Sequence, residues 1–457
     1  MILSMKNNKC KFIKYFCLTL IFFFSTFATS FAASELKQPF ADFPLYETYL
    51  NNGLRVLIYV DSSTPTVSTQ LWYNVGAIYD PPYKSGVSHL LEHMDGTKNY
   101  KPREISAAVD ALGGEDNAFT SNLYVCYYVD LSKDFYENAL KFGAERMSSL
   151  DIPENKFQSE RAVVMEERRL GENEPYDVLW EQFDLLAYKL HPYRNPIIGW
   201  MEDLQRIELK DLINHYHTYY QPSNTVCVIA GAVEPNDALV KVEKYFSKIK
   251  SKPVAHPVFV EPEQQGEQKM TIYKKVSTPA IVIGYHTTDV YSLDFYALEV
   301  LEALLSSGKD SRLYKKIVYE KQYALEVSAG NYLERDAGTF YFYAMPTKTT
   351  LVDSVQKLIN DELAKIQSTD KDSITNEEMQ RVKNQVIAYE IYSKDRSRGM
   401  GMRIGRQSIT TGDLRDMIEY PQRIDQVTKD DVRRVINTYF VPKNRTVATL
   451  LPEENKK

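Results

Sequence analysis

Two histidines and a glutamate stand at a spacing that suits metal-assisted hydrolysis. His89 and His93 are four residues apart, and Glu92 comes directly before the second histidine. Positions i and i+4 share one face of a helix, so both imidazoles can bind the same ion. A carboxylate beside that face can take a proton from a metal-bound water. The order H-x-x-E-H is the inverse of the H-E-x-x-H motif of zinc proteases. The alternative is a helix with two solvated histidines.

A second predicted helix offers the third ligand that such a site needs. A catalytic zinc site takes three protein ligands and leaves the fourth position to water. Residues 159–169 predict a helix on which Glu160 and Glu167 lie seven apart, on one stripe. Glu167 is therefore a candidate ligand, and Glu160 a candidate partner that orients a ligand. Glu166 points about 100° away and is expected to be a solvated charge. Without H-x-x-E-H, a charged helix face would be the better interpretation.

Several further motifs follow in a fixed order along the chain. They occupy residues 86–94, 113–121, 160–167, 191–193 with 198–200, and 311–314. Together they resemble the pitrilysin or insulinase family of zinc metallopeptidases, in its half-size branch similar to mitochondrial processing peptidase. The resemblance covers nearly the whole chain beyond its N-terminal segment. Ordered motifs with family-like spacing are far more specific than any one of them.

The resemblance implies one Zn²⁺ ion per chain and names its ligands. His89, His93 and Glu167 would bind the ion, and Glu92 would be the general base. Glu160 would support the ligand set. The implied chemistry is peptide-bond hydrolysis by a metal-bound water.

The resemblance also implies a strand edge for the substrate. Asn117 and Ala118 would lie on that edge and hold the peptide backbone. An extended peptide can add to an exposed sheet edge through main-chain hydrogen bonds. The alternative for Asn117 is a turn residue after Gly113 and Gly114.

The chain departs from the family pattern in two places. Met94 is followed by Asp95 alone before Gly96, so the segment is two residues shorter than usual and lacks an aromatic residue. This shortening is expected to change the shape of the substrate pocket, and it removes no ligand. Family sites are also completed by an Arg and a Tyr, seven apart, whose positions here fall on Val318 and Leu325.

This second departure implies a partner. Arg312 and Tyr319 have the family's spacing, but they are expected to be ordinary helix-surface residues. The resemblance then predicts a heterodimer, in which a related partner chain supplies the Arg/Tyr pair.

The N-terminus is typical of a secretion signal. Four lysines precede an apolar run over residues 15–27, and Ser30-Phe31-Ala32 offers a small-x-small cleavage site. We expect residues 1–32 to be removed, the protein to be secreted to a periplasm, and no stable membrane anchor to remain. The alternative is an uncleaved anchor. Cleavage removes four lysines and no acidic residue, and takes the formal net charge from −6 to −10. Such an acidic chain without a basic run argues against nucleic acid as a partner.

The two cysteines that would remain are Cys126 and Cys227, each inside a strand-like run. A pair in a secreted protein can form a disulfide. We expect two buried free thiols instead, because each sits in an apolar segment.

The order of elements predicts two related α+β domains, each a mostly antiparallel sheet packed with helices. The first would span residues 40–247, followed by a Pro-rich linker at 248–268 and a second, metal-free domain at 269–457. Strand-like runs are at 55–59, 66–74, 123–131 and 225–230, and helical stretches at 87–94, 105–112, 135–150, 178–189 and 209–219. The second half restarts the same order, but its helix at 293–305 contains no histidine.

These observations predict a secreted zinc endopeptidase that cleaves short or unfolded peptides. The substrate class is implied by the resemblance. The alternative is a non-catalytic scaffold or binding subunit with the same fold, since a fold does not fix a function.

Overall fold

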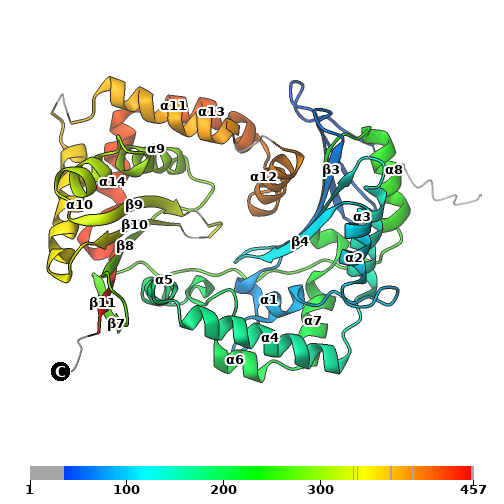
Figure 1. Cartoon of the computed structure of the whole chain (residues 1–457). Helices are drawn as coiled ribbons and strands as arrows, with labels where there is room; N and C mark the ends of the chain where they lie inside the picture. Colours follow the sequence, from blue (N-terminus) through cyan, green and yellow to red (C-terminus); the bar gives the residue numbers. More distant parts are fainter. Residues whose placement is uncertain (1–34, 333, 337, 371–372, 393–395, 454–457) are drawn as a thin grey trace, which may run out of the picture. The chain divides into compact units, whose positions relative to one another are not determined.

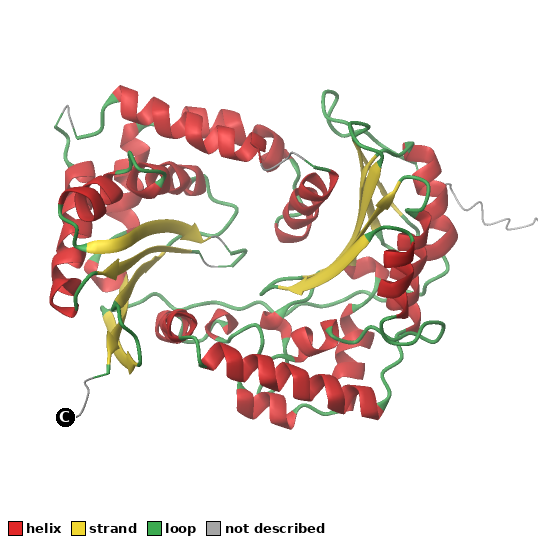
Figure 2. Cartoon of the chain, in the orientation of Figure 1, coloured by secondary structure: helices red, strands yellow, loops and turns green. Residues whose placement is uncertain are grey.

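The computed structural model describes residues 35–332, 334–336, 338–370, 373–392 and 396–453. The expected signal peptide, residues 1–32, lies outside the described residues. Within the described part, no helix has the length and apolar character needed to cross a membrane. Two separate sheets, each with helices packed against it, are visible in Figures 1 and 2.

The first sheet has six strands in the order β1-β2-β6-β3-β5-β4. Its strands are β1 (Leu45–Tyr49), β2 (Arg55–Val60), β3 (Thr66–Tyr73), β4 (Glu115–Thr120), β5 (Val125–Ser132) and β6 (Thr225–Gly231). All neighbours are antiparallel except β2 and β6. Strand β3 is covered on both faces, so its polar side chains bond one another: Gln70 donates to Ser68 Oγ, and Trp72 Nε1 donates to Gln70.

The second sheet repeats the arrangement with five strands in the order β7-β11-β8-β10-β9. They are β7 (Gln268–Lys274), β8 (Ala280–His286), β9 (Ala324–Tyr332), β10 (Thr339–Pro346) and β11 (Arg445–Pro452). Here too one pair, β7 and β11, is parallel and the others are antiparallel. Without β1, the first sheet has the same strand order and the same parallel pair. The predicted fold class, two related α+β units, is confirmed.

Helices cover both sheets (Figure 2). The α-helices are α1 (Val87–Glu92), α2 (Glu104–Ala111), α3 (Glu137–Ser149), α4 (Glu154–Glu172), α5 (Pro175–Ala187), α6 (Met201–Arg206), α7 (Leu209–Tyr219), α8 (Pro235–Phe246), α9 (Asp294–Ser306), α10 (Val352–Gln367), α11 (Asn376–Tyr392), α12 (Ser397–Thr410), α13 (Arg415–Gln426) and α14 (Lys429–Tyr439). Short helical turns are η1 (Ala77–Tyr79), η2 (Pro192–Arg194), η3 (Pro222–Asn224), η4 (Tyr314–Glu320), η5 (Thr349–Leu351) and η6 (Pro442–Asn444).

Each half of the chain contributes a helix to the sheet of the other half. Helix α5 packs on β7, β8 and β11, where Phe183 Cζ lies 2.2 Å from the point that a Cβ on Gly284 would occupy. Helix α12 packs on β3 and β6, and a Cβ on Gly405 would lie 2.1 Å from Trp72 Nε1. The glycines are therefore required by close approach. Strand order divides the chain into two halves, but packing joins them.

Residues 250–267 contain no helix or strand, as expected of the segment predicted to link the halves. The segment is nevertheless attached to the first half, because the Glu261 carboxylate accepts the backbone amides of Lys189, Leu190 and His191. The boundaries of the predicted domains stay a prediction. Cys126 and Cys227 are both free and buried, which confirms the prediction of free thiols.

Candidate metal centre

Helix α1 carries His89, its C-cap residue is His93, and the backbone at its N-terminus is tightly packed. It begins after Gly86, whose φ is +94°, and a Cβ there would lie 2.5 Å from the Ile198 carbonyl oxygen. Only glycine fits such a backbone and such an approach. The helix ends at Glu92, two residues before the predicted end, with His93 as its C-cap. The amide of Met94 bonds the Leu91 carbonyl, so the last turn is tighter than an α-helical turn.

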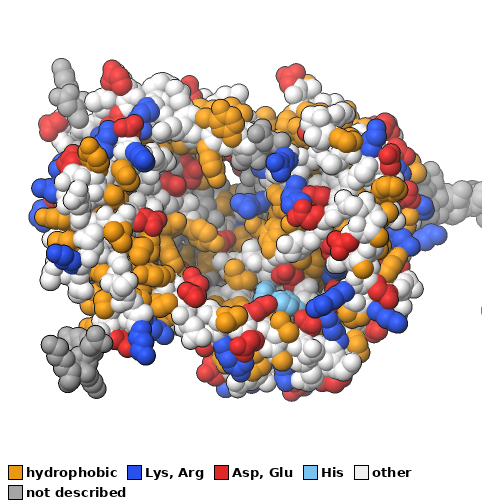
Figure 3. Space-filling model, viewed as in Figure 1, with side chains coloured by type: hydrophobic (Ala, Val, Ile, Leu, Met, Phe, Trp, Pro, Cys, Tyr) orange, Lys and Arg blue, Asp and Glu red, His pale blue; other side chains and the backbone are white. Residues whose placement is uncertain are grey.

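The structure brings the three predicted ligands together. Nitrogen or oxygen atoms of His89, His93 and Glu167 all lie within 4.8 Å of one another, the one such group among the described residues. His93 Nε2 is 3.7 Å from Glu167 Oε2. Zinc binds at about 2.0–2.2 Å, so two tetrahedral ligand atoms lie roughly 3.3–3.6 Å apart. The three donors are of the types that zinc binds, and the 3.7 Å separation is close to the tetrahedral spacing. Figure 3 shows histidine side chains in pale blue on this face, beside acidic side chains in red.

Glu160 lies on the other side of the His93 ring. Its Oε2 is 3.5 Å from His93 Nδ1, while its Oε1 accepts a hydrogen bond of 2.8 Å from Lys156. A carboxylate opposite the ligating nitrogen fixes the orientation of an imidazole. Helix α4 thus presents Glu160 and Glu167 to the two nitrogens of one ring, as their spacing predicts. Glu166, by contrast, is exposed and pairs with Arg169.

His89 is in the neutral form that metal binding requires. Burial, with the neighbouring His93, lowers the pKa of His89 to about 4. The His89 Nδ1 atom is buried and has no hydrogen-bond partner among the described residues. The two rings cross at 70° with centroids 4.8 Å apart, so they do not stack. Burial therefore suits a neutral imidazole at His89.

Glu92 lies between α1 and strand β4. Burial raises the pKa of its carboxyl, and the Thr120 hydroxyl, which donates to Glu92 Oε2, opposes that rise. His93 and Arg146 also lower this pKa, whereas Glu167 raises it. A largely buried carboxylate with a raised pKa is suited to accept and release a proton.

Strand β4 is an edge strand, because β5 is its single partner in the sheet. Asn117 pairs with Tyr128 and Ala118 with Tyr127, so both residues lie on that edge as predicted. The turn alternative for Asn117 is wrong. Asn117 Oδ1 accepts the amide of Ala118 at 2.8 Å. Figure 1 shows β4 close to α1.

Side chains contact part of the corresponding edge, strand β9, of the second sheet. On α9, Glu302 accepts the backbone amide of Asn331 at 2.8 Å, and Ser306 donates to the Ala329 carbonyl at 3.0 Å. Side chains of α9 therefore cover part of the β9 edge. The helix predicted at 293–305 is α9, and it contains no histidine, as the sequence shows.

The prediction that Arg312 is an ordinary helix-surface residue is wrong. The Arg312 guanidinium forms two hydrogen bonds with the Glu378 carboxylate and a third with the Ser373 carbonyl. The guanidinium fork matches a carboxylate, so the pair fixes α11 against this segment. Tyr319 is exposed (74%), as expected. Val318 packs on the second core, and Leu325 is 62% exposed.

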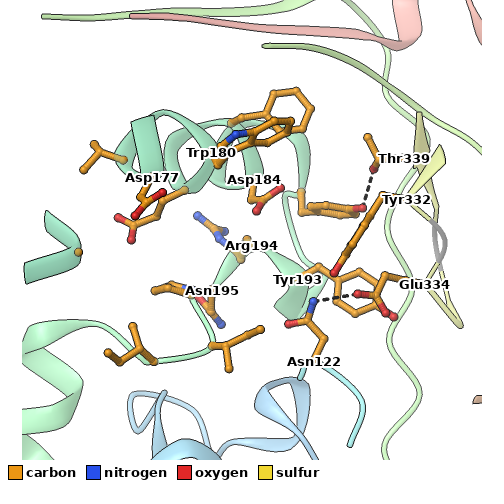
Figure 4. Close-up of a pocket in the computed structure, with 18 of the residues that line it drawn as sticks. Asn122, Asp177, Trp180, Asp184, Tyr193, Arg194, Asn195, Tyr332, Glu334 and Thr339 are labelled. Carbon is orange, nitrogen blue, oxygen red and sulfur yellow. Dashed lines mark hydrogen bonds between the residues drawn. The ribbon is translucent and has the colours of Figure 1, made fainter. Parts of the chain in front are cut away.

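A cavity of about 720 Å³ lies next to the candidate metal site (Figure 4). Arg168, the residue after the candidate ligand Glu167, lines it, but none of the three candidate ligands does. Helices α4 and α5, residues 193–198 and the β9–β10 hairpin form its walls. Four carboxylates line it: Asp177, Glu181, Asp184 and Glu334. Burial and the nearby Glu334 and Glu181 carboxylates raise the pKa of Asp184 to about 7.

Part of the acidic lining of this cavity could be predicted from the sequence. Asp177, Glu181 and Asp184 are spaced i, i+4 and i+7, which places them on one face of α5. Two arginines line the cavity as well, and Arg168 is paired with Glu181. Glu334 could not be assigned from the sequence, because it lies in the distant connection between β9 and β10, where it accepts a hydrogen bond from Asn122.

Comparisons with known proteins agree with this geometry. Residues 55–200 match "Insulinase (Peptidase family M16)", and residues 206–386 match "Peptidase M16 inactive domain". The zinc protease PqqE of Helicobacter pylori is 30% identical over 411 residues, 88% of this chain and 92% of that protein. A crystal structure of a protease from Helicobacter pylori has a TM-score of 0.85 at 30% identity, and covers 90% of this chain and 100% of that one.

A probable mitochondrial-processing peptidase subunit beta of Arabidopsis thaliana is 26% identical over 428 residues, 90% of this chain and 80% of that protein. The chain therefore belongs to the peptidase M16, or insulinase, family of zinc proteases, in its half-size form. The resemblance seen in the sequence is confirmed. The description that residues 206–386 match names an inactive domain of this family.

Proposed function

We propose that this chain is the zinc-binding subunit of an endopeptidase that cleaves short or unfolded peptides. The observation that carries the proposal is the juxtaposition of His89, His93 and Glu167 within 4.8 Å, with Glu92 between that group and an edge strand. Zinc would supply Lewis-acid chemistry and a water that ionises near pH ~7.

The residues around the ion have separate roles. His89, His93 and Glu167 would hold the metal, and Glu160 would keep the His93 ring in place. Glu92 would take the proton of the attacking water and pass it to the leaving amine.

Strand β4 would hold the substrate backbone. The outward edge at Asn117 and Ala118 can pair with an extended peptide, and Thr120 on the same strand already contacts the base. Because an extended segment is required, folded proteins would be poor substrates and unfolded peptides good ones.

The acidic cavity would select a cationic substrate side chain. Its four carboxylates outnumber its two arginines, Arg168 and Arg194, and its aromatic walls include Trp180 and Tyr341. A lysine or arginine side chain can extend its stem along such walls and place its charge among the carboxylates. Comparing peptides that differ by Arg and norleucine at each position would test the preference.

The location is also a proposal. Residues 1–32 would be cleaved as a signal peptide and the protein would be periplasmic. N-terminal sequencing of exported protein should begin near Ala33. Recovery of Met1 in a membrane fraction would contradict it.

The partner would be a related chain that lacks H-x-x-E-H and carries the Arg/Tyr pair. Val318 and Leu325 cannot donate hydrogen bonds to a substrate carbonyl or an oxyanion. Loss of one such donor typically costs about 10²–10³-fold in rate. A homodimer would repeat the deficit.

A second candidate is a non-catalytic subunit with the same fold, and the same two residues favour it. The complete set of ligands and base favours the peptidase. Zinc content and peptide cleavage, measured with and without the candidate partner, distinguish them. Zinc without cleavage under either condition would favour the non-catalytic subunit.

A further inference from the structure

Helix α1 is too short to fix its own orientation. It has six residues, Val87–Glu92, and helices of this length are marginal in isolation. Its N-cap residue is Gly86, so no N-cap side chain bonds the free amides of the first turn. Two polar side chains from other elements contact its two ends instead.

Asp80, directly after η1, covers the N-terminal end. Its Oδ2 accepts the Gly86 amide at 2.6 Å, and its Oδ1 accepts both the amide (2.9 Å) and the hydroxyl (2.7 Å) of Ser88. Ser88 comes directly before the ligand His89. A side chain outside the helix thus does what an N-cap residue normally does.

A second contact fixes the same serine. Ser88 Oγ lies 3.0 Å from His215 Nε2 on α7. Because the Ser88 hydroxyl donates its proton to Asp80, His215 is the donor in this contact. The N-terminal turn is therefore tied both to Asp80 and to α7.

Arg146, on α3, covers the C-terminal end. Its Nη1 donates to the Met94 carbonyl at 3.1 Å, where the last turn leaves carbonyls without helical partners. Its guanidinium lies 4.1 Å from the centre of the Tyr127 ring. Packing on an aromatic face restricts the guanidinium to this position.

We propose that Asp80 and Arg146 are positioning residues that hold α1 from its two ends, so that His89 and His93 face Glu167. The proposal rests on the zinc site proposed above, and neither side chain is a ligand. Zinc affinity should then depend on both residues, although neither contacts the ion.

Zinc dissociation constants of the full chain, measured by competition with a chromogenic chelator, test this proposal. Asp80→Asn and Arg146→Met should each weaken zinc binding by about 10-fold or more, the effect typical of residues that orient ligands. Arg146→Lys should recover part of the loss, since lysine can still donate.

Two controls remove equivalent contacts from helices without ligands. Asp431 caps α14 with Thr428, and Arg433 donates to the carbonyl of Ser368, the C-cap of α10. Asp431→Asn and Arg433→Met should lower the unfolding temperature of the zinc-free protein but leave zinc affinity unchanged.

Equal zinc affinity in wild type, Asp80→Asn and Arg146→Met would overturn the proposal, as would an equal loss in the two controls. If Asp80→Asn does not fold, Ser88→Ala removes one of its contacts and should weaken zinc binding in the same direction; an unchanged affinity there also contradicts the proposal. Absence of zinc from wild type would instead contradict the proposed function itself.

Discussion

The hydroxyl of Thr120 donates a hydrogen bond to the carboxylate of Glu92, and this contact joins the candidate base to the candidate substrate edge. Thr120 is the last residue of β4, and Glu92 the last residue of α1. A peptide paired with β4 would therefore lie beside both the base and the ligands on α1. The proposed hydrolysis therefore depends on the contact between helix α1 and the edge strand β4.

Glu92→Gln should retain zinc and lose peptidase activity. The amide fits the same space but cannot accept a proton from water, and loss of a general base costs on the order of 10²–10⁴-fold in rate. Glu166→Gln is the matched control, because Glu166 is exposed on α4 and pairs with Arg169. Cleavage by Glu92→Gln at the wild-type rate would show that Glu92 is not the base.

The acidic cavity should bind a cationic side chain more tightly as pH rises. Asp184 has a pKa raised to about 7 by burial and by its acidic neighbours, so it gains its charge between pH 6 and 8. The KM of an arginine-containing peptide should fall by on the order of 10-fold over this range, equivalent to about 1.4 kcal/mol. Asp184→Asn should remove that dependence.

The same residue predicts a change in stability. The pKa of Asp184 in the folded protein lies above its ordinary value of 3.8, so the folded state holds this proton more tightly than the unfolded state. The contribution of Asp184 to the free energy of unfolding is therefore fully present below pH 3.8 and is lost as pH rises through about 7. The free energy of unfolding of Asp184→Asn should therefore fall less than that of wild type between pH 5 and 8.

Glu299→Gln is the control for the effect on KM. Burial also raises the pKa of Glu299 to about 7, but Glu299 does not line the cavity.

The purified chain alone should be a poor peptidase and should become active with its partner. By the resemblance, the positions of the family's Arg/Tyr pair fall on Val318 and Leu325, which is the basis of this prediction. Arg312 cannot take that role without breaking its pair with Glu378. Co-purification followed by a peptide-cleavage assay measures the effect. Full turnover by the lone chain that Arg312→Ala abolishes would contradict the need for a partner.

Gly405→Ala should destabilise the protein by about 1–3 kcal/mol, because the added Cβ would meet Trp72 Nε1 at 2.1 Å. Gly171→Ala, in α4, meets nothing within 4 Å and should stabilise it by roughly 0.5–1 kcal/mol. Thermal unfolding of both variants checks the contact between α12 and the first sheet. A tolerated alanine at residue 405 would contradict the close packing.

The sequence predicts features that depend on local periodicity. Helix α7 spans Leu209–Tyr219, the predicted range, and the structure brings together the candidate ligands that the i, i+4 and i, i+7 spacings indicated. Features that depend on contacts between distant segments could not be predicted. The pair of Arg312 with Glu378, the bond from Arg146 to Met94, and the exchange of α5 and α12 all belong to this class.

Zinc content per chain tests the central claim most directly. Elemental analysis of purified wild type should give one zinc per chain, and His93→Ala should give none, because that substitution removes a ligand that also faces Glu160 and Glu167. His217→Ala is the control, since His217 does not belong to the metal-binding group. Equal zinc content in wild type and His93→Ala, or none in wild type, would contradict the assignment of this site.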